Sequence, residues 1–141
     1  MNKYRDKSDF EINKAVAEYY LTRAYRFNSA DEVVELIDID LSCEFGGKIN
    51  LVDTQAVGTF DPCNNPADAW PIILKNRISI IIPGNEYSDG YSTPFAASGF
   101  DDVSHITRNT YYTDEESFNQ NPLRAAMEVF LMMKDAENEK V

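Results

Sequence analysis

The segment that follows Asn121 and Pro122 constrains the fold most, because it is apolar on almost every side of the helix that it predicts. Asparagine is a good helix cap and proline suits the first helical position, so we expect a helix to begin at this pair. Its apolar residues are Leu123, Ala126, Met127, Val129, Phe130, Leu131, Met132 and Met133. Such a helix is either buried on two sides or lies in a subunit interface, and the second reading predicts a homodimer through this helix.

A chain of 141 residues has the length of one ordinary domain and can bury a core without disulfides or metal. Neither an internal repeat nor a linker is evident, so we expect a single domain over residues 1–141. Cys43 and Cys63 lack the spacing of a zinc site or a redox motif. The polar N-terminus is unlike a signal peptide and no run is long enough to span a bilayer, which predicts a cytoplasmic protein.

The charge balance of the chain excludes several classes of partner. Lys and Arg number 13 and Asp and Glu number 24, which gives a formal net charge of -11. Such a surface repels phosphate backbones and anionic lipids, so we expect neither direct nucleic-acid binding nor membrane binding. The charge is sufficient to keep the protein in solution, and it also suits a mimic of a polyanion or a protein with a basic partner.

The first helix is predicted from a capping box. Ser8 and Glu11 have the spacing at which each side chain bonds a free backbone amide of the other, so a helix should begin at Ser8. The apolar stripe that follows predicts that it continues to about Tyr25. A loop or a short helical turn is expected over residues 28–32.

A hairpin is predicted after this loop. Residues 37–42 alternate between apolar and polar, which is typical of a half-buried strand. Gly46 and Gly47 can form its turn, since glycine accepts positive φ, and residues 48–52 would be the partner strand.

A second cap-and-proline pair predicts a helix in the middle of the chain. Asn65 is a good cap, Pro66 suits the first helical position, and Asp68 suits the positive end of the helix dipole. Pro71 interrupts the hydrogen-bond ladder, so this helix should be brief or kinked. The isoleucine-rich residues 77–82 then give the strongest strand signal in the chain.

Residues 84–120 have no sustained periodicity and are too long for an ordinary connection. They contain many aromatic residues, which argues against plain disorder, and residues 106–112 would hold an additional strand. The predicted fold is therefore α+β: a small antiparallel or mixed sheet packed against N-terminal and C-terminal helices, with a long irregular aromatic loop.

Four blocks of the sequence resemble the NinX family of small proteins from lambda-like phages and prophages. They are Ser8–Lys14, Asp61–Ile73 (DPCNNPADAWPII), Asn76–Ser79 and Asn121–Met127. The resemblance implies a phage or prophage origin and expression in the bacterial cytoplasm. It implies no defined biochemical activity.

No catalytic or metal constellation is recognised. His105 is the only histidine, and no motif places it beside Cys43 or Cys63. Four aspartates could together hold a hard cation, but without the spacing of any known metal motif, so solvent-facing carboxylates are the expected reading. These are Asp38, Asp40, Asp101 and Asp102. We therefore assign no catalytic residue, metal ligand or cofactor.

The turn that leads into the middle helix is the best candidate site. A helix N-terminus offers amide donors that suit a phosphate or carboxylate, and Trp70 adds a stacking surface. In the alternative reading, Asn65 only caps the helix while Trp70 and Ile72 fill the core. The candidate ligand-binding residues, with the arginines that a phosphate would require, are Asn64, Asn65, Asp68, Trp70, Arg77, Arg108 and Arg124.

The aromatic loop suggests a different kind of target. Its charged residues are Glu86, Asp89, Asp101, Asp102, Asp114, Glu115 and Glu116 against Arg108 alone. This balance favours a neutral or cationic target, or a basic protein surface.

The sequence thus favours a non-enzymatic binding protein, a phage accessory factor that engages a host small molecule of nucleotide type or a host protein, with a role against host defence. Two alternatives stay open: a dimeric structural or interaction protein, including an acidic mimic of a polyanion, and a metal-dependent enzyme.

Overall fold

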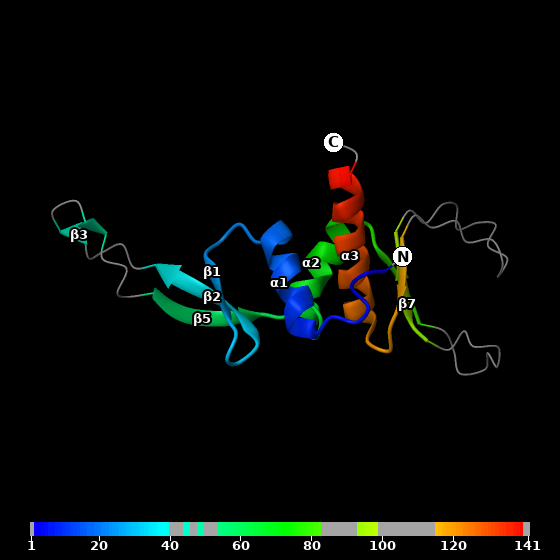
Figure 1. Cartoon of the computed structure of the whole chain (residues 1–141), viewed down its shortest axis with the longest axis horizontal. Helices are drawn as coiled ribbons and strands as arrows, with labels where there is room; N and C mark the ends of the chain where they lie inside the picture. The colour runs from blue at the N-terminus through cyan, green and yellow to red at the C-terminus, as the bar shows by residue number, and fades with distance from the viewer. Residues whose placement is uncertain are drawn as a thin grey trace.

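The computed structural model describes residues 2–39, 44–45, 48–49, 54–82, 93–98 and 115–139. In this part, α3 lies between the other two helices and the sheet that contains β7, and strands β2 and β5 extend away from the helices (Figure 1). The elements, in chain order, are α1 (Asp9–Tyr20), β1 (Tyr25–Asn28), β2 (Val33–Ile39), β3 (Glu44–Phe45), β4 (Lys48–Ile49), β5 (Thr54–Phe60), α2 (Pro66–Lys75), β6 (Ser79–Ile81), β7 (Phe95–Ala97), β8 (Glu116–Phe118) and α3 (Pro122–Glu139).

Helix α1 begins where the capping box predicts and ends earlier than expected. Ser8 is the N-cap, and its Oγ accepts a hydrogen bond from the backbone N–H of Glu11 at 3.2 Å. The helix ends at Tyr20, because Leu21 already has an extended backbone. Tyr25 instead opens strand β1, so pairing with β2 outweighs the helical spacing that suggested a longer helix.

Strands β1, β2 and β5 form one antiparallel sheet in the order β1-β2-β5. The strand predicted over residues 37–42 begins earlier, at Val33, and its last three residues lie outside the described part. Its partner β5 was not predicted, because the sequence TQAVGTF mixes small and polar residues without alternation. The register shifts between Leu36 and Ile37, which marks a β-bulge.

A short ribbon of β3 and β4 lies between β2 and β5 in sequence. Phe45 pairs with Lys48 on either side of Gly46 and Gly47, which themselves lie outside the described residues. The predicted position of the hairpin turn is therefore right, but the strand expected on its N-terminal side is not the one that pairs there. The strand over residues 37–42 was expected to pair here, and its described part, residues 37–39, pairs with β5 instead.

The second three-stranded sheet has the order β6-β7-β8 and is also antiparallel. Strand β6 lies within the predicted strand over residues 77–82. Strands β7 and β8 fall inside the segment that was expected to be irregular, and each has only three residues, too few for a period-two pattern. The strand predicted over residues 106–112 lies outside the described residues.

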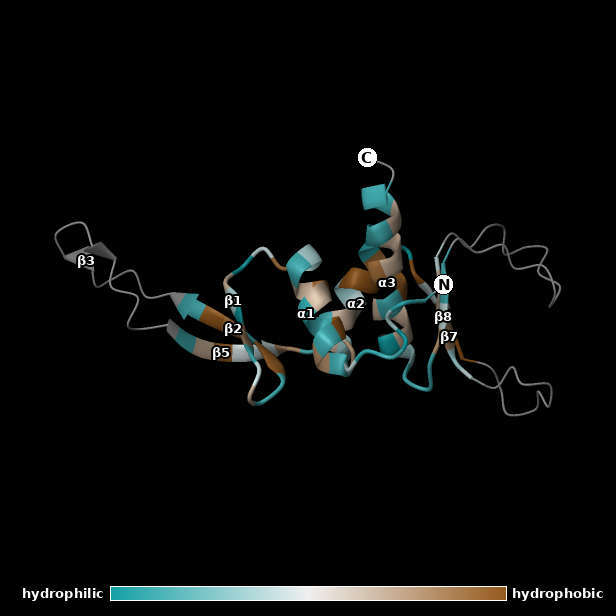
Figure 2. Cartoon of the chain, in the orientation of Figure 1, coloured by the Kyte–Doolittle hydropathy of each residue, from teal (hydrophilic) through white to brown (hydrophobic). Residues whose placement is uncertain are grey.

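Helix α3 is the centre of the core. Every residue from Arg124 to Met132 is buried, because the helix packs against α1 and α2 as well as against β6, β7 and β8. Its C-terminal end is hydrophilic (Figure 2). The nearly all-apolar sequence is thus explained by burial on two sides within one chain, and a homodimer through this helix stays a prediction.

The fold is α+β, as predicted, but the described residues form two three-stranded antiparallel sheets and the β3-β4 ribbon in place of the single sheet expected. The core joins α1, α2, β2, β5, the second sheet and α3. Its largest fully buried apolar side chains are Ile12, Val16, Val34, Ile72, Met127, Val129, Phe130 and Leu131.

Candidate functional site

The turn before α2 satisfies the start of the helix from within the chain. The backbone N–H groups of Asn64 and Asn65 donate to the carbonyl of Asp61 at 3.1 and 2.7 Å. Asn65 is the N-cap, as predicted, and its Oδ1 accepts from the N–H of Ala67 at 3.0 Å. Pro66 has no N–H to offer, so the amide donors of this helix start are largely occupied.

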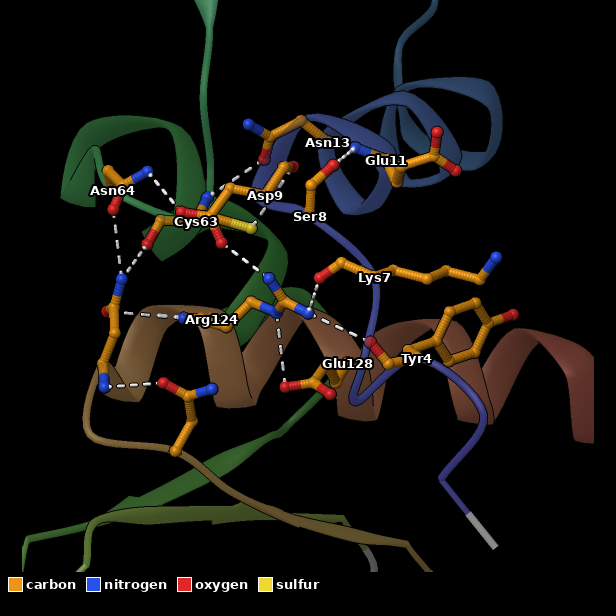
Figure 3. Close-up of polar contacts among 12 residues, drawn as sticks. Tyr4, Lys7, Ser8, Asp9, Glu11, Asn13, Cys63, Asn64, Arg124 and Glu128 are labelled. Carbon is orange, nitrogen blue, oxygen red and sulfur yellow. Dashed lines mark hydrogen bonds and ion pairs between the residues drawn. The ribbon is translucent and has the colours of Figure 1, made fainter. Parts of the chain in front are cut away.

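Arg124 and Asn64, two of the predicted site residues, meet at one carboxylate (Figure 3). Arg124 donates to Oδ1 of Asp9 at 2.6 Å, and Asn64 donates to its Oδ2 at 3.1 Å. The same guanidinium donates to the backbone carbonyls of Tyr4 and Lys7, so it ties the N-terminal segment to α3. Only 8% of the Arg124 side chain is exposed, which makes this a structural ion pair rather than an open ligand site.

Glu128 completes this pair from one turn further along α3. Its Oε2 lies 3.4 Å from Nε of Arg124, within ion-pair range but without hydrogen-bond geometry. Its Oε1 accepts from Nδ2 of Asn2 at 3.1 Å. The side chain is 1% exposed, so loss of Arg124 would leave a buried carboxylate without its charge partner.

Two asparagines that were not assigned to the site join the turn to α1 and α3. Asn13 donates to Oδ1 of Asp61 at 2.7 Å and accepts from the N–H of Cys63 at 3.2 Å. Asn121, the N-cap of α3, donates to the carbonyl of Cys63 at 2.6 Å and to Oδ1 of Asn64 at 3.2 Å. Only the Asn-Pro pair at Asn121 was visible in the sequence, because Asn13 sits mid-helix without a recognisable motif.

The thiol of Cys63 is buried at the centre of this network. Burial raises the pKa of the thiol well above its usual range, and the nearby carboxylate of Asp9 adds to the rise. The thiol therefore stays protonated at neutral pH and is a poor nucleophile.

Negative charge surrounds the turn. The carboxylates of Asp9, Asp61 and Asp68 all bond to the turn or to its neighbours, and Asp68 accepts from the N–H of Asp61 at 2.9 Å. Arg124 is the only cation that bonds to this group among the described residues. A phosphate placed at the turn would meet more negative than positive charge.

Trp70 and Leu74 lie on the opposite side of α2 from the core. Their exposed fractions are 55% and 59%, whereas Ile72 and Ile73 are buried. Ala67 and Pro71 are also exposed, so the spacing i, i+3, i+4, i+7 puts four apolar residues on one solvent-facing stripe. We call Ala67, Trp70, Pro71 and Leu74 the α2 stripe.

The remaining candidates are dispersed. Arg77 is exposed just beyond α2, with a left-handed backbone at φ 54°. Arg108, His105 and Cys43 lie outside the described residues, as do Asp40, Asp101 and Asp102. Asp38 is exposed and lies 3.6 Å from Nη2 of Arg23.

A shallow groove of about 360 Å³ lies between the N-terminal segment and α1. Its positively and negatively charged side chains nearly balance. Nζ of Lys14 lies 3.7 Å from Oε1 of Glu11 within it. The lining residues are Lys3, Tyr4, Lys7, Glu11, Lys14, Ala15 and Glu18. None of the predicted site residues lines this groove.

These features define the class of protein: a small α+β domain whose polar residues are joined in an internal network. Among the described residues, no group of three or more His, Cys, Asp or Glu side chains could hold a metal ion. The described helices also lack the combination of length and hydrophobicity that a membrane span requires.

The sequence profile of the family described as Bacteriophage P22, NinX matches residues 3–134. The chain therefore belongs to the NinX family, which confirms the resemblance carried by its separated blocks, and this is a family of phage proteins. Searches of curated proteins and of solved structures returned no match.

Proposed function

We propose that this chain is a non-enzymatic phage accessory protein that binds a protein of the bacterial host, in the host cytoplasm, through the α2 stripe. The single observation that supports this most is the exposure of Trp70 and Leu74 on an ordered helix. Helices that present apolar residues at this spacing commonly insert them into a groove of a partner. Tryptophan is also among the residues that most often dominate the energy of an interface.

The state of the polar residues supports binding rather than catalysis. A catalytic base or nucleophile must be free to exchange a proton or to attack a substrate. Arg124 and Asn64 instead bond to Asp9, and the thiol of Cys63 is buried with a raised pKa. Their hydrogen bonds hold α1, α2 and α3 together, which keeps the α2 stripe in place.

The size of the stripe favours insertion into a partner over self-association. A ten-residue helix is about 15 Å long, whereas a standard interface buries about 800 Å² on each side. The stripe alone is too small for a flat dimer, and two copies would each carry a net charge of -11. A partner with a groove can enclose the stripe and bury more of it. Host defence factors are among the targets that we propose, since occupying their binding surface would be sufficient to block them.

Site-specific photo-cross-linking tests this proposal. A photo-reactive amino acid replaces Trp70 in one variant and Val57 in another, and both are expressed in phage-infected host cells. Val57 is the matched control, because it is 52% exposed and lies on β5 rather than on α2. We expect one host protein to cross-link at position 70 and not at position 57.

The cross-linked host protein is then purified and its affinity is measured directly. Trp70 is the only tryptophan, so its emission should shift to shorter wavelength when the partner covers it. Trp70→Ala and Leu74→Ala should each weaken binding at least about tenfold, and Val57→Ala should not. Cross-linking only to a second copy of this chain, or an affinity unaffected by both α2 substitutions, would refute the proposal.

A further inference from the structure

Helix α2 ends in a backbone motif that normally contains glycine. Asn76 is the C-cap, the N–H of Arg77 donates to the carbonyl of Leu74 at 3.3 Å, and the N–H of Ile78 donates to that of Ile73 at 3.0 Å. This pair of hydrogen bonds is the Schellman motif, in which the residue after the cap adopts a left-handed conformation. Glycine is usual there because it has no Cβ to clash.

Arginine occupies that position in this chain. Arg77 has φ 54°, a conformation that is unfavourable for a side chain of this size. The neighbouring bonds of the motif and the buried side chains of Ile73 and Ile78 hold the backbone in place. Glu32 has the same φ in an exposed turn, so the strain at Arg77 supports a function only together with the position of its side chain beside the α2 stripe.

The charge of Arg77 is not used within the described part of the chain. Arg77 and Lys75 are exposed, and neither has a carboxylate partner among the described residues. Six other described cations lie in ion pairs, namely Lys3, Lys14, Arg23, Arg26, Arg124 and Lys134. Arg5 and Lys7 are also outside these ion pairs, but they lie in the N-terminal segment, whereas Lys75 and Arg77 lie beside Leu74 at the end of α2.

We infer that Arg77, together with Lys75, is the charged end of the docking surface on α2 and binds a carboxylate on an acidic rim of the host partner's groove. The inference rests on the proposed function, because it specifies the partner of the same surface. Arginine is suited to this role, since its planar guanidinium can donate two parallel hydrogen bonds to one carboxylate. The α2 stripe supplies the apolar contact, and Arg77 supplies direction and specificity.

The first test uses the free protein and needs no partner. Arg77→Gly should raise the melting temperature by about 2–4 °C, because glycine relieves the left-handed backbone. Glu32→Gly is the matched control: Glu32 also has φ 54°, is exposed, and lies in the turn between β1 and β2. It should raise the melting temperature similarly. A melting temperature unchanged or lowered by Arg77→Gly would overturn the inference, since no strain would then be retained for function.

The second test measures affinity for the host protein that cross-links at position 70. Arg77→Gly and Arg77→Ala should each weaken binding at least about tenfold, although only the glycine variant is more stable. Glu32→Gly should leave the affinity unchanged. Added salt should weaken wild-type binding more than binding of Arg77→Ala, because the variant has lost the ion pair.

The outcomes separate the two proposals. If Trp70→Ala weakens binding and Arg77→Ala does not, the inference about Arg77 is wrong while the proposed function stands. If no host protein depends on Trp70, both are overturned.

Discussion

Helices α2 and α3 begin with the same pair of residues, Asn and Pro, but differ in how much of their surface the rest of the fold buries. Each has an asparagine cap followed by proline, and each is apolar on more than one side. Helix α3 is covered on all sides from Arg124 to Met132 by α1, α2 and the second sheet, whereas α2 is covered on one side only. Helix α2 therefore exposes large apolar side chains, Trp70 and Leu74, where the central turns of α3 expose none, and this difference separates residues that hold the protein together from residues available to a partner.

The largest effect expected from this comparison is on stability. Phe130→Ala in α3 should lower the free energy of unfolding by about 3–5 kcal/mol, because it leaves a cavity in a closed core. Trp70→Ala in α2 should change it by no more than about 0.5 kcal/mol, since Trp70 is 55% exposed and lies outside the closed core. Urea denaturation monitored by circular dichroism measures both. Similar losses for the two variants would mean that the α2 stripe is part of the core.

Arg124 and Arg77 extend the comparison to charged residues. Arg124→Ala should lower the free energy of unfolding by about 3–5 kcal/mol, because Glu128 would remain buried without its partner. Combining Arg124→Met with Glu128→Leu should recover most of this loss, since no isolated charge is then buried. Arg77→Ala, at an exposed position, should have little effect. Chemical denaturation of the three variants checks this, and a double variant as unstable as Arg124→Ala would contradict the burial argument.

The loss of stability on removing each asparagine cap should differ by about a factor of two between α2 and α3. Asn65→Ala removes one hydrogen bond to an exposed helix start and should cost about 1 kcal/mol. Asn121→Ala should cost about 2 kcal/mol, because Asn121 also donates to Cys63 and Asn64 across the core. Thermal unfolding of both variants, with serine substitutions as controls that retain a capping oxygen, would show the difference. Equal losses would mean that the bonds of Asn121 to the turn contribute nothing.

These contrasts also show what the sequence could reveal. The two asparagine caps, the helix start at Ser8 and the strand around Ile80 follow from local patterns, and the structure contains all of them. Of the capping box, the described residues show the bond from the N–H of Glu11 to Ser8 and not the reciprocal one. Strands β5, β7 and β8 have no such pattern, because their pairing depends on distant partners.

The ligand-binding role of the candidate site stays a prediction, but part of its local geometry followed from the sequence. Asn65 could be identified as a cap from its sequence neighbours alone. Whether Trp70 faces the core or solvent could not, since both sides of α2 are apolar and only the position of α3 decides which is covered. Likewise, the spacing of Arg124 from Asp9 gave no sign that the two side chains would meet.

The buried end of the turn before α2 predicts a pH dependence. The pKa of Cys63 is raised in the folded protein, so the unfolded chain loses the thiol proton first as the pH rises. The contribution of Cys63 to stability should therefore be constant below about pH 8.5 and then fall by about 1.4 kcal/mol per pH unit. Cys63→Ala should flatten this slope between about pH 8.5 and 10, the upper limit being where Tyr4, whose pKa is also raised, begins to contribute. Urea denaturation across this range measures the slope. An unchanged slope in Cys63→Ala would mean that groups other than Cys63 cause the loss of stability.

The smallest effect is expected at the start of α2, where a nucleotide was one of the predicted ligands. A panel of nucleotides at about 1 mM should not change the melting temperature, because Asn65 already occupies the N–H of Ala67 and the carboxylates of Asp9, Asp61 and Asp68 repel phosphate. A nucleotide that bound with a Kd of about one hundredth of that concentration would add about 2.7 kcal/mol to the free energy of unfolding. The melting temperature would then rise by roughly 5–10 °C. Differential scanning fluorimetry resolves a change of that size. A shift in melting temperature that disappears in Asn65→Ala would mean that the ligand site is the N-terminus of α2 and not the α2 stripe. The functional difference between α2 and α3 would then lie in their first turns.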